Sequence, residues 1–489
     1  MSRPTDSKYA HAEHSESGLV KVLGSRDALF VGFGAMIGFG WIVLTSGWLQ
    51  DAGTLGAMLA FAAGGIIMIF VGLVYSELVA AMPFAGGEHN YLLRGMGPRA
   101  AVFGSWAITG GYISVVMFEA VAIPQTIEYL VPNLSQIYLW NFAGSDVYLT
   151  WALVGSAAAL LIGWVNIRGI REASLVQTFV VSFLLLVGVL LIVGTAVGAE
   201  PSNAQPLFTG GVPGMIAVLV AVPFLFVGFD VIPQSAEEVN IPPRRVGALV
   251  VVSVLMAIAW YLLIIFTSSM AIPSAELGNY ELVTADALIA LLGHDFWGAV
   301  VIAGGLAGII TSWNAFLIGA SRLMFSMARA RMIPLWFGKL HPKYRTPSNA
   351  VLFISALAFI APFMGSGMLG WIVDAGSPAI IIAYFMVSIV FLVLRRTEPR
   401  MDRPMRVGGR GNVGGVIIGC MSVVLTALLL FIYIPVTPWS AQLEWPSWVM
   451  FGGWMLLGIY FLVRLPGGIR PGEQAEDQLI TAVKAKRGE

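Results

Sequence analysis

The stretch GAMIGFGWIVL, residues 34–44, lies in the middle of the first long apolar run of this sequence, Ala28 to Leu49. A segment that crosses lipid is expected to be an unbroken helix, because no water is available there to satisfy free backbone groups. Gly34, Gly38 and Gly40 nevertheless fall in the middle of this run. The stretch therefore predicts a membrane helix that is broken around a small solute.

The composition of the chain places it in a membrane. Hydrophobic residues make up 58% of its 489 residues, charged residues only 11%, and the mean hydropathy is +0.84. A soluble globular chain usually carries about 25% charged residues. The formal net charge is zero, so the composition gives no electrostatic reason to expect a nucleic-acid partner. We expect a polytopic membrane protein whose surroundings are the lipid bilayer.

Apolar runs recur along nearly the whole chain, and each is close to the length of about 20 residues that crosses a bilayer. They predict an all-α protein with about twelve transmembrane helices. The predicted spans are residues 27–50, 53–82, 100–124, 147–166, 174–198, 212–239, 246–270, 297–326, 347–365, 370–394, 413–437 and 447–464.

The lysines and arginines orient these spans. All 27 of them fall on one side of the arrangement, whereas alternate loops such as 125–146 and 271–295 contain none. Positively charged loops remain in the cytoplasm. We therefore expect a multi-pass protein of the cell inner (cytoplasmic) membrane whose N- and C-termini are both cytoplasmic.

A second interrupted span supports the first. The run at 212–239 contains Pro223, Gly228, Asp230 and Pro233, and it opens the second half if the first ten spans form two groups of five. Matched interruptions in two halves indicate a substrate site in secondary transporters, although packing alone explains most glycines in membrane helices. The predicted segments are a cytoplasmic tail (1–26), two five-helix repeats (27–198 and 212–396), an extracellular loop (199–211), a cytoplasmic loop (397–412), two further helices (413–464) and a cytoplasmic tail (465–489).

The two interruptions offer complementary chemistry. A break exposes backbone N–H groups at the start of the following half-helix, where the helix dipole is positive, and those of residues 39–41 suit a carboxylate. Glycines let a solute approach the backbone without a side chain in the way. The freed carbonyls of residues 226–228 are acceptors that suit an ammonium group. The pair of breaks could therefore bind both ends of a zwitterion.

At these breaks the sequence resembles the amino acid–polyamine–organocation (APC) superfamily of permeases, which have the five-plus-five inverted-repeat fold of the bacterial leucine transporter. The resemblance covers about residues 20–400, and five motifs in the right order at the right spans make it highly specific. Its motifs are GAMIGFGWI (34–42), YSELVAAMPFAGGEHNYLLRGMGP (75–98), NIRGIREAS (166–174), FVGFDVIPQSAEEVNIPPR (226–244) and WNAFLIGASRLMFSMARARMIP (313–334). The resemblance implies that helices 1 and 6 are discontinuous. The substrate-binding residues that it implies are Ile37, Gly38, Phe39, Gly40, Trp41, Phe226, Val227, Gly228, Phe229 and Asp230.

One departure from the family pattern leaves the substrate open. Many members have a small hydroxyl residue between the two glycines of the first break, whereas this chain has Phe39. The stretch GWLQDAGTLG (47–56) also looks like bacterial permeases for small amines such as ethanolamine. A decarboxylated amine, ethanolamine-like or polyamine-like, is therefore an alternative to an amino acid, and exchange of solutes is an alternative to net transport.

Glu119 is one of three acidic residues, with Glu77 and Asp230, that we expect well inside predicted spans. It lies in YISVVMFEAVAIP (112–124) and has no obvious positive partner. Ionisable groups inside spans are rare and usually functional. Without a cation, a buried carboxylate is protonated or binds an incoming amine. The sequence predicts a substrate-binding or proton-carrying role for Glu119.

The coupling ion remains open between sodium and the proton. In some proton-coupled relatives a lysine on span five takes the place of a sodium ion, and Leu184 stands at that position here. Thr311 and Ser312 on span eight could join span-one carbonyls around sodium. Such hydroxyls often bond only to their own helix. The alternative to sodium coupling is proton coupling through Glu119.

The prediction is a secondary active transporter, by alternating access, of a small amino acid or amine. We expect neither enzymatic chemistry nor an organic cofactor. A homodimer through spans eleven and twelve is a family-level expectation. A transceptor is disfavoured because the tails at 1–26 and 465–489 are short for a signalling domain.

Overall fold

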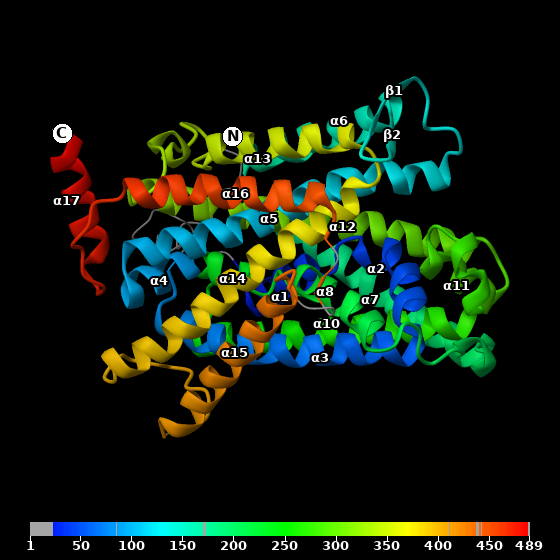
Figure 1. Cartoon of the computed structure of the whole chain (residues 1–489), viewed down its shortest axis with the longest axis horizontal. Coiled ribbons are helices and arrows are strands. Elements are labelled where there is room, and N and C mark those ends of the chain that lie inside the picture. The colour runs from blue at the N-terminus through cyan, green and yellow to red at the C-terminus, as the bar shows by residue number, and fades with distance from the viewer. Residues whose placement is uncertain are drawn as a thin grey trace, which may run out of the picture.

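The computed structural model describes residues 23–84, 86–169, 173–409, 411–436, 440–441 and 443–487. These residues form an elongated bundle whose long helices run along the longest axis of the molecule (Figure 1). The predicted N-terminal tail, 1–26, lies outside the described residues up to residue 22.

The long helices lie close to the predicted spans, because each forms from an apolar run. They are α3 (Thr45–Ala81), α5 (Pro98–Leu130), α6 (Leu149–Arg168), α7 (Ala173–Gly198), α8 (Gly211–Phe226), α10 (Pro243–Ala271), α12 (Phe296–Arg329), α13 (Ser348–Ile360), α14 (Met368–Thr397), α15 (Val413–Ile432) and α16 (Trp445–Arg464). The short elements are α1 (Ser25–Met36), α2 (Gly40–Val43), α4 (Glu88–Met96), α9 (Val231–Gln234), α11 (Val283–Leu292), α17 (Ala475–Arg487), β1 (Tyr138–Phe142) and β2 (Ser145–Tyr148).

Among the described residues, 11 helices are long and apolar enough to cross a membrane. The remaining predicted span, 347–365, corresponds to the 13 residues of α13 and the 4 residues of a 3₁₀ turn that continues it. That length is at the short end of the range that spans a bilayer. The prediction of an all-α polytopic membrane protein is confirmed, while its division into two repeats stays a prediction.

The first span is interrupted where its glycines predict. Helix α1 ends at Met36, and α2 begins at Gly40. The continuation into α3 passes through Gly53, whose φ of 72° is not helical. The N–H groups of Leu55 and Gly56 donate to the carbonyl of Leu207, as the first turn of a new helix requires. Gly53 therefore separates the first span from the second.

The sixth span is interrupted as well. Helix α8 ends at Phe226, Val227 is extended, and Gly228 has a φ of 135°. This φ lies where side chains are strongly disfavoured, so glycine is needed here. The chain resumes as the single turn α9 at Val231.

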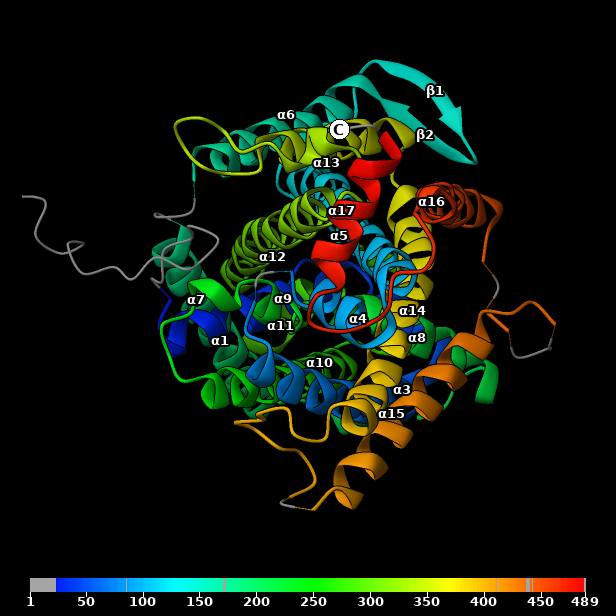
Figure 2. The same ribbon diagram turned by 90° about the vertical axis from the view of Figure 1, so that its left-hand side faces the viewer.

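The two breaks lie in the interior of the bundle. Viewed along its length, α9 lies near the centre, with α5 and α12 on one side and α3 and α10 on the other (Figure 2). In the most apolar stretch of 18 residues in α5, 89% of the residues are buried, against 22% in the corresponding stretch of α16. Helix α5 is thus a central helix, and α16 is peripheral with a largely lipid-facing surface.

Several elements in the predicted loops had no signal in the hydropathy pattern. Strands β1 and β2 form an antiparallel hairpin between α5 and α6, with Asn141 opposite Asp146. Helix α11 lies between α10 and α12, and α17 lies in the predicted C-terminal tail. They are short or amphipathic elements, which a search for long apolar runs does not detect.

One end of the bundle is held by a buried ion network around Glu77, at the end of α3. Its carboxylate accepts hydrogen bonds from the guanidinium group of Arg395 and from the backbone N–H of Val407, and it forms an ion pair with Arg403. Arg395 also contacts the carbonyl of Asn412. The network joins α3, the end of α14 and the predicted 397–412 loop. Glu77 therefore has a structural role: it holds helix ends together.

Candidate functional site

The two interrupted helices meet in the bundle. A Cβ atom added to Gly228 would lie 2.9 Å from the backbone nitrogen of Met36, so the second break packs directly against the end of α1. The hydroxyl of Tyr261 on α10 lies 2.9 Å from the carbonyl oxygen of Met36 and 3.2 Å from that of Leu225. One tyrosine therefore bridges the carbonyl groups at both breaks.

The first break contains the carboxyl group of Glu119, which comes from α5. A Cβ added to Gly38 would lie 2.0 Å from Glu119 Oε1 and 2.9 Å from the hydroxyl of Ser312. The same carboxyl group lies beside the backbone N–H of Phe39. Within the described part of the chain, Glu119 Oε2 and the Ser312 hydroxyl are buried without a hydrogen-bond partner. A bound ion, ligand or water at the break is one explanation for buried polar atoms of this kind.

The half-helix after the first break has free donors. Among the described residues, no backbone acceptor is bonded to the N–H groups of Gly38, Gly40 or Trp41. The carbonyl of Trp41 accepts hydrogen bonds from the hydroxyls of Thr45 and Thr284, which fix the half-helix in place. Of the three N–H groups predicted as donors, those of Gly40 and Trp41 thus have no backbone acceptor among the described residues, and that of Phe39 lies beside the carboxyl group of Glu119.

Helix α12 packs tightly against the same break. A Cβ added to Gly308 would lie 2.7 Å from the carbonyl oxygen of Ile37 and 2.9 Å from that of Gly38. Only glycine lets α12 approach the exposed backbone this closely.

The two predicted sodium ligands point to different places. Ser312 lies with Glu119 in the first break, as described above. The hydroxyl of Thr311 lies 3.0 Å from the carbonyl oxygen of Gly308 on its own helix and 3.4 Å from that of Gly34. These oxygens are of the type that sodium prefers, but the stronger bond of Thr311 is the one to its own helix. Among the described residues, no group of three or more His, Cys, Asp or Glu side chains is placed to hold a metal ion.

The second break is closed by Asp230. Its Oδ1 accepts the backbone N–H of Gly228 at 2.8 Å, and its Oδ2 accepts the hydroxyl of Tyr112 from α5 at 2.8 Å. Asp230 therefore holds the unwound backbone and links it to α5. This arrangement explains the carboxylate after the glycine as a group that orients the break.

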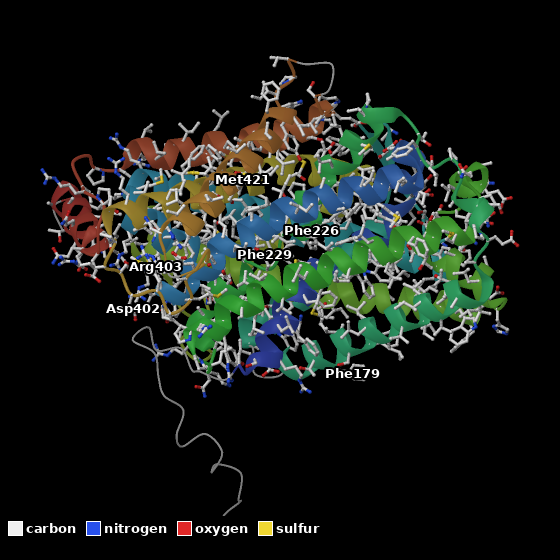
Figure 3. The ribbon with its side chains drawn as sticks, turned by 90° about the horizontal axis from the view of Figure 1, so that it is seen from below. Phe179, Phe226, Phe229, Asp402, Arg403 and Met421 are labelled. Carbon is white, nitrogen blue, oxygen red and sulfur yellow. The ribbon has the colours of Figure 1, made fainter. Side chains whose placement is uncertain are left out.

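Phe226 and Phe229 flank the second break and lie near the middle of the molecule's length (Figure 3). The ring of Phe226 packs against Tyr261, with centroids 5.4 Å apart. The ring of Phe229 packs against Tyr75 and Tyr384, at 5.5 and 5.3 Å. The aromatic side chains that the sequence placed at the breaks are thus part of a buried aromatic layer, together with Trp41, which packs on α10.

The predicted residues are largely brought together. The segments at 37–41 and 226–230 are adjacent, and Glu119 and Ser312 join the first of them. Their side chains are buried, so the structure is a conformation closed around the breaks. Tyr261, Tyr112 and Tyr384 were missed, because each lies in an apolar run where a tyrosine is an ordinary core residue.

A bundle of membrane-length helices with two facing helix breaks defines a multi-pass membrane protein of the transporter type. The amino acid permease family model matches residues 23–460, and the chain belongs to that family. The predicted superfamily is confirmed, and the protein is a membrane transporter and not an enzyme.

Characterised relatives cover nearly the whole chain. The branched-chain amino acid permease BcaP of Bacillus subtilis (strain 168) is 25% identical over 460 residues, which cover 92% of this chain and 94% of that protein. The methylthioribose transporter of the same organism is 24% identical over 92% of this chain and 95% of its own length. The glutamate/serine transporter AimA of that organism is 27% identical over 84% of this chain and 77% of its own length.

Proposed function

We propose that this protein is a secondary active transporter that carries a small amino acid across the cytoplasmic membrane by alternating access. The relatives support an amino acid as substrate, since BcaP and AimA are named for amino acids. The one-sided distribution of lysine and arginine supports cytoplasmic N- and C-termini. In this orientation the end of the bundle that carries Arg403, seen in Figure 3, faces the cytoplasm.

The observation that carries the proposal is the meeting of the two breaks. The first presents backbone N–H groups without a backbone acceptor, at Gly38, Gly40 and Trp41. The second brings extended backbone at Val227 and Gly228 against the end of α1. Donors on one side and carbonyl acceptors on the other are complementary to the carboxylate and the ammonium of a zwitterion.

The closed packing supports alternating access. Phe39, Trp41, Phe226 and Phe229 have no exposed surface. A solute therefore reaches the breaks only after helices move, and it leaves only after a second movement. A permanently open pore would instead need a lining of exposed polar groups.

A decarboxylated amine is the second candidate, and the position of Glu119 favours it. The carboxyl group of Glu119 already lies beside the N–H of Phe39 at the first break. An amine without a carboxylate of its own would find one there, with aromatic rings nearby for cation–π contacts. A zwitterion would have to use the neighbouring N–H groups of Gly40 and Trp41.

Counterflow in proteoliposomes tests the proposal. Vesicles loaded with unlabelled leucine, serine, glutamate, lysine, ethanolamine or putrescine are diluted into the labelled form of the same compound. We expect saturable counterflow with at least one amino acid. Counterflow with ethanolamine or putrescine alone would select the amine, and a non-saturable flux, or none, from folded protein would contradict the transporter proposal.

A pair of glycine substitutions ties the flux to the breaks. Gly38→Ala places a Cβ 2.0 Å from Glu119 Oε1, so the carboxyl group must leave its position. Gly452→Ala on α16 meets nothing within 4 Å and serves as the control. We expect loss of counterflow in the first variant and normal counterflow in the second. Equal activity of the two would place the substrate elsewhere.

A further inference from the structure

A second acidic cluster lies beside the second break and was not part of the predicted site. Its centre is Glu88, the first residue of α4, whose side chain is fully buried. Glu88 Oε2 accepts a hydrogen bond from the amide of Gln234 on α9. A Cβ added to the preceding Gly87 would lie 3.0 Å from that amide nitrogen. The start of α4 is therefore packed against the turn that follows the break.

Tyrosines from α3, α14 and α4 itself lie around the two carboxyl groups of Glu88 and Asp230. Tyr75 packs against Tyr91 at 6.4 Å between ring centroids and against Tyr384 at 5.7 Å. Tyr75 lies within hydrogen-bonding reach of Glu88, and Tyr384 within reach of Asp230. We call Glu88, Asp230, Gln234 and these tyrosines the α4 cluster.

Among the described residues, neither Glu88 nor Asp230 forms an ion pair with a basic side chain. His89 is buried with both ring nitrogens unpaired in the described part of the chain, and burial lowers its pKa to about 4, so it is neutral at pH 7. Arg322 on α12 donates to Ser235, one residue beyond Gln234. Arg94, further along α4, forms ion pairs with Glu398 and Glu473.

The α4 cluster contains unpaired donors and unpaired acceptors: within the described residues, the hydroxyls of Tyr75, Tyr91 and Tyr384 have no hydrogen-bond partner. Within the described residues, Glu88 Oε1 and Gln234 Oε1 are buried acceptors without a partner. Asp230 has both carboxylate oxygens occupied, by the N–H of Gly228 and the hydroxyl of Tyr112. A proton on Glu88 would remove one of two buried negative charges and add a donor to the cluster.

We propose that Glu88 is a proton-binding site, and that the proton it exchanges with the cytoplasm is the ion coupled to transport. This inference rests on the proposed function and places the coupling ion away from both Glu119 and the Thr311–Ser312 pair. Burial raises the pKa of Glu88, which agrees with a protonated side chain in the closed conformation.

The position of Glu88 explains how its proton affects the break. While Glu88 is neutral, α4 packs against α9 and the cytoplasmic side stays closed. When the proton leaves for water, two carboxylates remain in one buried cluster. Repulsion between them, and the cost of burying the charge, favour a conformation in which water reaches Glu88. The proton and the solute are then released on the same side.

The test compares gradient-driven accumulation with exchange. Proteoliposomes are given an inside pH one unit above the outside pH, with the membrane potential held at zero by potassium and valinomycin and without sodium. For one proton per solute, one pH unit supports about tenfold accumulation of the substrate found by counterflow, because a tenfold proton ratio is balanced by a tenfold solute ratio. We expect this from the wild type.

Glu88→Gln keeps the shape of the protonated side chain and removes its proton exchange. We expect it to retain counterflow but to accumulate nothing above equal concentrations. Glu88→Asp, which restores an acid, should recover part of the accumulation. Glu473→Gln, an exposed glutamate at the same end, should behave as the wild type.

The outcomes separate the two proposals. Absence of counterflow in the wild type would overturn the proposed function. Counterflow together with full pH-driven accumulation in Glu88→Gln would overturn the proton site alone. So would accumulation in the wild type that requires a sodium gradient and does not respond to the pH gradient. If Glu88→Gln does not fold, alkalinisation of the external medium during uptake by the wild type still supports the proton as coupling ion, and its absence contradicts it.

Discussion

Neutralising Glu77 should destabilise the protein more than any exposed charge change at the same end. In Glu77→Gln, the guanidinium groups of Arg395 and Arg403 lose the carboxylate that both contact, at 3.0 and 3.1 Å from its Oε1. The side chains of Arg395 and Glu77 are only 2% and 1% exposed. The substitution therefore leaves two buried positive charges next to each other.

The magnitude follows from this burial. Removing one partner of a buried ion pair costs about 3–5 kcal/mol, because the remaining charge is left without compensation. Unfolding entropy is about 2.1 cal/mol/K per residue near 60 °C, or about 1 kcal/mol/K for 489 residues. The expected fall in the midpoint of thermal unfolding is therefore about 3–5 °C.

The assay is thermal unfolding of purified protein in one detergent at one scan rate, followed by intrinsic fluorescence. The matched control is Glu398→Gln, which removes a carboxylate paired with Arg94 at 21% and 27% side-chain exposure. This partly exposed pair is better solvated than the Glu77 network, and solvent-exposed pairs contribute about 0–1 kcal/mol, so the control should shift clearly less than Glu77→Gln. Equal shifts in the two variants would refute the reasoning, since burial would then not decide the cost.

Three further changes probe the breaks. Gly308→Ala places a Cβ 2.7 Å from the carbonyl oxygen of Ile37. Overpacking costs about 1–3 kcal/mol, so the substrate Kd measured in a titration should rise about 5- to 150-fold. An unchanged Kd would show that α12 is free to shift. Tyr261→Phe removes the hydroxyl that bridges two carbonyls, and the loss of about 1–3 kcal/mol should lower the unfolding midpoint; no change would mean that water replaces it. Thr311→Val should leave uptake unaltered, whether the external medium contains sodium or choline. If sodium stimulates uptake by the wild type and the substitution abolishes this stimulation, Thr311 is a sodium ligand after all.

The spans and both breaks could be predicted from the sequence because each depends on residues that are close together in the chain. Long apolar runs mark the helices, and Gly38 and Gly228 mark the places where the backbone is free. Gly228 shows why this works, because its φ of 135° strongly disfavours other residues. A backbone requirement of this kind is visible in one position of the sequence.

The partners of the breaks could not be predicted in the same way. Tyr261 reaches both breaks from α10, and Glu88 reaches α9 from the start of α4. These contacts depend on which helices pack together in the fold, and the sequence of an apolar run does not show which other helices it will contact. Glu119 was found only because a carboxylate in a span is unusual in itself, and its place at Gly38 needed the coordinates.

The α4 cluster and the breaks share one carboxylate, and this imposes a quantitative condition. Asp230 accepts the N–H of Gly228, which packs against the end of α1, and it also faces Glu88 in the cluster. Coupling between two binding sites is reciprocal in free energy. If protonation of Glu88 raises the affinity for substrate by some factor, substrate must raise the proton affinity of Glu88 by the same factor. The substrate Kd should therefore depend on pH, and substrate binding should take up protons, in the wild type. Both effects should disappear in Glu88→Gln, and any that remain would mean that another group, such as Glu119, takes up part of the protons.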